Sequence, residues 1–167
     1  EAIAAKWGDA ALAKSSQLIR PLLQAPPGYV LVAADYSAIE ACGVAWSASA
    51  ARLLHRFQSG EDVYIRTAIE DIYPGQLPAD ATGVTHAFER FVGKQAVLGC
   101  GYGCGPAKFA VMCAKLGRPI GSELAETTVQ TYRKITAPEV PKLWQAIENA
   151  AMDAMCDPGK PHWFADG

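Results

Sequence analysis

The sequence predicts a mainly α-helical chain, and two observations carry that prediction. First, apolar residues recur at helical spacing in most segments that lie between Gly- and Pro-rich breaks. Second, only one short run, Tyr29–Ala34, is continuously apolar in the way expected of a strand buried on both faces. A lone strand cannot form a sheet. We therefore expect its partners outside this chain or in the irregular tail, and an α+β fold for the full protein.

The helices are expected in order between recognisable breaks. Pro26, Pro27 and Gly28 end the first helix, and the loop "PGQLPADATG" precedes the helix expected over residues 84–99. Thr136 and Glu139 have the spacing of a capping box at the start of the last helix. The expected helical segments are residues 1–24, two helices between about 38 and 57, 62–73, 84–99, 106–116, 122–135 and about 138–156.

The composition indicates a soluble globular protein, with 50% hydrophobic and 19% charged residues. No apolar run reaches membrane-spanning length, and the N-terminus does not have the pattern of a signal peptide. Five cysteines at uneven spacing do not suggest a disulfide framework, so we expect a reduced, cytoplasmic setting without a membrane. The net charge of -2 shows no basic excess and gives no hint of nucleic-acid binding.

Asp35 lies where the predicted strand ends, and Glu40 follows five residues later. Side chains at strand ends can converge on a ligand, and a carboxylate beside a backbone carbonyl suits Mg²⁺. The alternative is that Asp35 and Ser37 cap the next helix, with Glu40 in its first turn beside the positive end of the helix dipole. Both interpretations stay open at this point.

Arg90 and Lys94 lie four residues apart, so they project from one face of a helix. Leu98 continues that face and Tyr102 lies near its far edge. Two neighbouring cations on an otherwise apolar helix repel each other unless a polyanion such as a triphosphate lies alongside. The alternative is a solvated face whose side-chain stems pack down on the helix.

Two motifs now give a specific resemblance. "DYSAIE" at 35–40 resembles the first palm motif of family A DNA polymerases, the bacterial DNA polymerase I type, and "R-x3-K-x7-YG" from Arg90 to Gly103 resembles their fingers-helix motif. The likeness covers residues 17–116 well and is closest to the phage and prophage branch. It implies a partial palm segment at 1–37, a fingers-like helical region at 38–135, and a helix and tail leading back toward the palm at 136–167.

The resemblance implies template-directed DNA synthesis by two-metal phosphoryl transfer. Asp35 would hold both Mg²⁺ ions, helped by the carbonyl of Tyr36. The primer 3'-oxygen would attack the α-phosphorus of the incoming nucleotide, and pyrophosphate would leave. Arg90 and Lys94 would bind the departing phosphates, with Lys94 also able to supply a proton. The implied partners are primer-template DNA and dNTPs.

The same resemblance assigns the nucleotide pocket. Leu98 stands where many relatives place an aromatic ring against the incoming nucleotide, Tyr102 would close the base-pair pocket, and Gly103 would let the template strand approach. Glu40 would be the steric gate that excludes a ribose 2'-hydroxyl. Tyr64 departs from the pattern, because many relatives carry a phosphate-contacting His there.

One family motif is missing from the sequence. The second palm motif, His-Asp-Glu, would supply another metal-binding carboxylate, but no "HD" or "DE" occurs in the chain. We therefore expect an incomplete fragment that is inactive by itself, with its oligomeric state left open. Two alternatives are a non-catalytic polymerase remnant that binds protein or DNA, and an unrelated helical protein with zinc on Cys100, Cys104 and Cys113, which lacks a fourth ligand.

Overall fold

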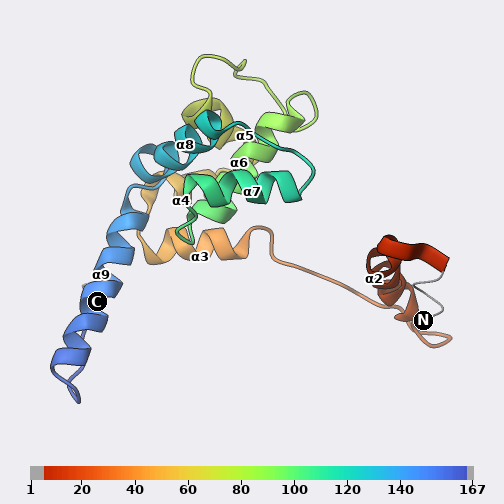
Figure 1. Ribbon diagram of the computed structural model, residues 1–167, viewed down its shortest axis with the longest axis horizontal. Coiled ribbons are helices and arrows are strands. Elements are labelled where there is room, and N and C mark those ends of the chain that lie inside the picture. Colours follow the sequence, from red (N-terminus) through yellow and green to blue (C-terminus); the bar gives the residue numbers. More distant parts are fainter. Residues whose placement is uncertain (1–5, 165–167) are drawn as a thin grey trace. The chain divides into compact units, whose positions relative to one another are not determined.

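The computed structural model describes residues 6–164, and helices with irregular connections make up this part of the chain (Figure 1). The mainly α prediction is therefore confirmed. The chain divides into two compact units, Glu1–Ser37 and Ala38–Gly167, which are described one at a time. The assignment of these parts to palm and fingers stays a prediction.

The first unit holds a short 3-10 turn, η1 (Gly8–Ala10), followed by helix α2 (Ala11–Leu22). This confirms much of the helix expected over residues 1–24, although residues 1–5 lie outside the described part. A turn follows, in which the backbone N–H of Tyr29 donates to the carbonyl of Pro26 at 3.0 Å. The breaks at Pro26 and Gly28 therefore lie where the sequence indicated.

The strand expected over Tyr29–Ala34 does not form, and this prediction was wrong. The segment is irregular, and Val30 and Val32 are 83% and 88% exposed. The physical reason is that a strand needs a neighbour for its backbone hydrogen bonds. The residues described here contain no other strand that could serve as one.

The second unit contains the remaining helices, and each expected helical segment is present with small shifts at its ends. Two of the segments continue from α-helix into a wider π-helical turn, a feature that the periodicity did not predict. The elements are α3 (Ile39–Ser47), α4 (Ala51–Gln58), α5 (Val63–Thr67) with π-turn η2 (Ala68–Ile72), α6 (Ala87–Cys100), α7 (Pro106–Lys115), α8 (Ser122–Thr131) with π-turn η3 (Tyr132–Thr136), and α9 (Glu139–Cys156).

Helix α6 lies at the centre of the packing of this unit and buries Val92, Ala96 and Cys100 in the core. Gly93 allows α6 to approach α5 closely. A Cβ at this position would stand 2.2 Å from the carbonyl oxygen of Tyr64, which is backbone and cannot move aside easily. The side of α6 next to Gly93 therefore faces Tyr64.

The capping box expected for the last helix is not formed. Pro138 is the residue that precedes α9, and no side chain caps it. The Thr136 hydroxyl instead donates to Oδ2 of Asp71 at 2.7 Å. A buried carboxylate is a stronger acceptor for this hydroxyl than the backbone of the helix start, because its hydrogen bonds are charge-assisted.

Candidate functional site

Arg90 and Lys94 of α6 both lie against the ring of Tyr64 on α5. The guanidinium carbon Cζ of Arg90 is 5.3 Å from the ring centroid, and Nζ of Lys94 is 5.9 Å from it. Both distances are within the range of a cation–π interaction. One aromatic ring therefore interacts with both cations, which offsets part of their mutual repulsion.

Asp62, the residue that precedes α5, joins this group through both of its carboxylate oxygens. Oδ1 accepts hydrogen bonds from the backbone N–H groups of Tyr64 at 3.0 Å and Ile65 at 3.3 Å, which caps the helix. Oδ2 accepts from Nε of Arg90 at 2.5 Å. The start of α5 and the side chain of Arg90 are thus tied to one residue.

The loop before α6 also contacts Arg90. A Cβ placed on Gly83 would lie 2.3 Å from Cδ and 2.7 Å from Nε of Arg90. The side chain of Arg90 therefore runs directly over the backbone of Gly83. A larger residue at position 83 would displace the arginine.

The Tyr64 hydroxyl adds no negative charge to this group. Burial raises the pKa of the Tyr64 hydroxyl, the charge of Asp62 adds to that effect, and Arg90 opposes it. Tyr64 is therefore a neutral ring at physiological pH. Lys94 is half-buried and forms no ion pair within residues 6–164, while Arg90 is paired with Asp62 through Nε.

The other expected pocket residues of this unit have different surroundings. Leu98 is half-buried and packs against the core, whereas Tyr102 is 60% exposed in the turn after α6. Gly103 in the same turn has φ of 73°, a left-handed conformation that favours glycine. Glu40 is exposed in the first turn of α3, as the sequence indicated.

Asp35 and Tyr36 belong to the first unit, and both are exposed. The capping alternative for Asp35 and Ser37 is wrong, because α3 begins after Ala38 and no side chain caps it. Within the described part of the chain, no group of three or more His, Cys, Asp or Glu residues is arranged to hold a metal ion. Cys100, Cys104 and Cys113 are buried among packed helices.

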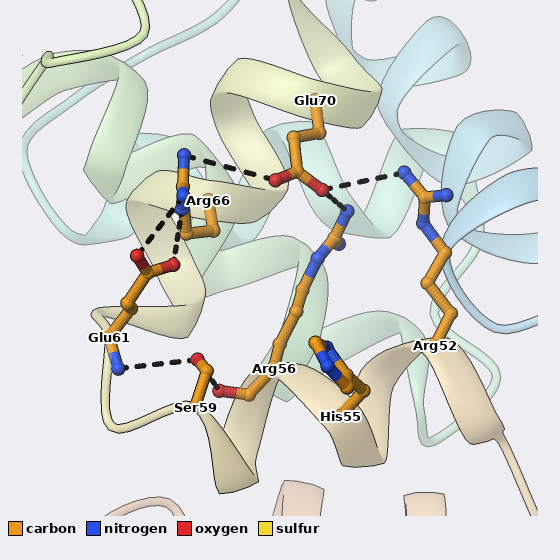
Figure 2. Close-up of a pocket in the computed structure, with 7 residues that line it drawn as sticks. All are labelled: Arg52, His55, Arg56, Ser59, Glu61, Arg66 and Glu70. Carbon is orange, nitrogen blue, oxygen red and sulfur yellow. Dashed lines mark hydrogen bonds and ion pairs between the residues drawn. The ribbon is translucent and has the colours of Figure 1, made fainter.

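A second charged cluster lies at a cavity of about 290 Å³ beside α4, and Figure 2 shows the residues that line it. Glu70 is at its centre, 2.6 Å from Nη2 of Arg56 and 3.6 Å from Nη2 of Arg52. Arg66 lies 3.9 Å from Glu70 and also pairs with Glu61 at 2.5 Å. The acids and bases alternate, so the cavity carries no marked excess of either charge.

Asp71 is buried behind this cavity and connects three segments of the chain. Its carboxylate accepts from Nη1 of Arg56 at 2.6 Å, from Nη2 of Arg52 at 2.6 Å and from the Thr136 hydroxyl at 2.7 Å. Burial alone would raise the pKa of Asp71, but the hydrogen bonds from Arg56 and Thr136 outweigh it and hold the pKa below its ordinary value. Asp71 is therefore an ionised group held by complementary partners.

Sequence reasoning missed Asp62, Gly83, Gly93 and the Arg56–Asp71 pair. Asp62 carried a usable signal, because an Asp directly before an apolar-periodic segment is typical of a helix N-cap. The sequence contained no comparable signal for its contact with Arg90, 28 residues away. Such a contact depends on how two helices pack.

The comparison with protein families identifies the family. The model of DNA polymerase family A matches residues 11–155, which is most of the chain. The chain belongs to DNA polymerase family A. This membership confirms the resemblance carried by the motifs at 35–40 and 90–103. Neither a curated protein nor a solved structure matches the chain.

Membership of a family of DNA polymerases places the chain among nucleotidyltransferases of DNA replication. The motif helix α6 and Asp35 both lie inside the matched range. In the residues described, this polymerase chain has no helix with the length and apolar character needed to cross a membrane.

Proposed function

We propose that the Arg90–Lys94 face of α6 binds the triphosphate of an incoming dNTP, and that the protein carries out template-directed DNA synthesis. The observation that carries this proposal is the placement of two cations beside one neutral ring. Lys94 forms no ion pair within residues 6–164, and Arg90 is bound to protein only through Nε among the hydrogen bonds found there. Two such donors are better suited to binding a polyanion than to a purely structural role.

Each residue then has a task in the reaction. Arg90 and Lys94 bind the phosphates that leave as pyrophosphate, and Lys94 donates a proton to the leaving oxygen. The Tyr64 hydroxyl donates a hydrogen bond to the same phosphates in place of the family's usual His. Leu98 and Tyr102 border the base-pair pocket, Gly103 leaves room for the template strand, and Glu40 excludes a ribose 2'-hydroxyl, which favours dNTPs over rNTPs.

The proposal assigns magnesium binding to Asp35 and the backbone carbonyl of Tyr36. The donor set fits, because Mg²⁺ is held by one or two carboxylates together with carbonyl and phosphate oxygens. The Asp35 side chain is exposed, and α3 does not use it as a cap, so its carboxylate is available. When bound, Mg²⁺ supplies Lewis-acid stabilisation of the attacking and leaving oxygens.

A binding experiment on the 167-residue chain tests the phosphate site. Mg-dATP is titrated into the unsubstituted chain and into Lys94→Ala by calorimetry at low ionic strength. We expect Lys94→Ala to weaken binding by about 10- to 100-fold, because a charge-assisted contact contributes about 1.5–3 kcal/mol. Lys142→Ala is the matched control, since Lys142 is exposed on α9. Equal affinities for the two variants would refute the assignment of Lys94.

Primer extension separates catalysis from the alternative of a non-catalytic polymerase module. The product of the complete reading frame is assayed on a primer-template with dNTPs and Mg²⁺. We expect template-dependent extension that is lost in Asp35→Asn. Failure of the unsubstituted product to extend any primer, with DNA binding retained, would support the non-catalytic module instead.

A further inference from the structure

We propose that Asp62 is a positioning residue that orients Arg90 for phosphate binding. The inference rests on the proposed function and adds a residue to it. Asp62 is not a ligand of the nucleotide in this scheme. It acts through the arginine, by holding Nε so that the outer end of the guanidinium faces the phosphates.

The choice of arginine atom is the first argument. Oδ2 of Asp62 accepts from Nε of Arg90, the nitrogen nearest the backbone, at 2.5 Å. The hydrogen bonds found in residues 6–164 leave Nη1 and Nη2 without a protein partner. A carboxylate that blocked the arginine would occupy these terminal nitrogens, because they form the fork that binds an anion through two parallel bonds. The contact at Nε instead leaves that fork available.

The second argument is that Arg90 is held from three sides. Asp62 binds Nε, the ring of Tyr64 lies 5.3 Å from Cζ, and Cδ packs so closely on Gly83 that a Cβ there would lie only 2.3 Å from it. These contacts come from the start of α5 and from the loop before α6. An arginine fixed in this way loses little further conformational freedom when it binds a phosphate.

The third argument is that Asp62 is itself immobilised. Its other oxygen caps α5 through the N–H groups of Tyr64 and Ile65. The same helix carries Tyr64, so the cap, the ring and the ion pair share one support. Movement of the arginine away from this position requires the loss of a contact to a rigid helix end.

The two roles of Asp62 can be separated by Asp62→Ser. Serine is a good N-cap, so α5 keeps its capping side chain, but the shorter hydroxyl does not reach Arg90. We expect Asp62→Ser to bind Mg-dATP about three- to tenfold more weakly, the range for releasing one immobilised side chain. The matched control is Glu61→Ser, which removes the same charge one residue earlier from a pair with Arg66. Glu61→Ser should change the affinity less than twofold.

A double-substitution cycle with Arg90→Ala shows whether Asp62 acts through Arg90. In the Arg90→Ala background, Asp62→Ser should cause no further loss of Mg-dATP affinity. The same loss in both backgrounds, or an affinity of Asp62→Ser equal to or tighter than that of the unsubstituted chain, would overturn the inference. Thermal unfolding of each variant verifies that the helices remain folded.

Nitrogen NMR shows whether Asp62 holds Nε of Arg90 in solution, whereas the double-substitution cycle shows whether this contact serves Mg-dATP binding. The Nε–H resonance of Arg90 is identified by its loss in Arg90→Ala. Its hydrogen should exchange slowly with water in the unsubstituted chain, and as fast as that of a solvent-exposed arginine in Asp62→Ser. No change in this resonance would also contradict the inference. If binding responds to Lys94→Ala but not to Asp62→Ser, this inference alone fails; if the unsubstituted chain binds no Mg-dATP, the proposed function fails with it.

Discussion

Two ion pairs of the second unit, Arg56–Asp71 and Arg90–Asp62, differ in burial and in the number of their partners. The Arg56 and Asp71 side chains are 6% and 0% exposed, whereas those of Arg90 and Asp62 are 35% and 33% exposed. The buried carboxylate accepts from two arginines and a threonine. The half-buried Arg90–Asp62 pair shares one hydrogen bond and leaves the arginine fork open. The comparison teaches that the residue types alone do not tell a structural ion pair from one that is available to a ligand.

The physical difference between the two pairs lies in desolvation. Removing one member of a buried pair leaves an uncompensated charge in a medium that solvates it poorly. A half-buried pair is still partly screened by water, and pairs open to solvent contribute only about 0–1 kcal/mol to stability. The buried pair should therefore control folding, while the half-buried pair should control binding with little effect on folding.

The largest effect is expected from Asp71→Ala. This change leaves Arg56 buried with only part of its compensation, because Glu70 still pairs with Nη2. We expect a loss of about 3 kcal/mol in the free energy of unfolding, at the lower end of the range for a broken buried pair. Urea denaturation measures it. Asp62→Ser is the control and should cost less than about 1 kcal/mol; equal losses for the two variants would contradict the comparison.

A smaller effect is expected from Gly93→Ala, which tests the α5–α6 contact that supports the half-buried Arg90–Asp62 pair. The added Cβ would meet the backbone oxygen of Tyr64 at 2.2 Å, so α5 and α6 must move apart. We expect a loss of about 1–3 kcal/mol in the free energy of unfolding and weaker Mg-dATP binding in calorimetry.

The control for this change is Gly43→Ala, also within a helix. No atom lies within 4 Å of a Cβ at Gly43, so the substitution should stabilise the chain by about 0.5–1 kcal/mol. If both substitutions changed the free energy of unfolding in the same direction, close packing at Gly93 would not be the cause of the effect of Gly93→Ala.

The smallest expected effect is the pH dependence of the stability that the Arg56–Asp71 pair contributes. Comparison with Asp71→Asn isolates this contribution. The pKa of Asp71 is lowered in the folded protein, so its ionised form stabilises the fold above the unfolded-state value of about 3.9. That contribution is lost as the pH falls through the folded-state pKa. The difference in unfolding free energy between the unsubstituted chain and Asp71→Asn should therefore shrink as the pH is lowered from 7 toward about 3. A difference that stays constant over this range would show that the charge of Asp71 is not the stabilising feature.

Much of the fold could be predicted from the sequence because helix formation is encoded locally. Apolar periodicity located the segments that became α3 to α9, and the spacing of Arg90 and Lys94 placed both cations on one face of a helix. The structure shows that this face of α6 meets Tyr64. The same local motifs indicated the polymerase family, which the family model confirms. Of the candidate site, the positions of Glu40 in the first turn of α3 and of Tyr102 after α6 were also predictable.

The sequence by itself thus determined the helices, the position of Arg90 and Lys94 on one face of α6, and the family. Only the tertiary structure decided which acid pairs with which base, that Thr136 binds Asp71 instead of capping α9, and that the apolar run at 29–34 stays irregular. The reason is that periodicity, caps and motifs depend on neighbours a few residues away. Ion pairs, close glycine contacts and strand pairing depend on segments far apart in the chain, and their positions are settled when those segments pack.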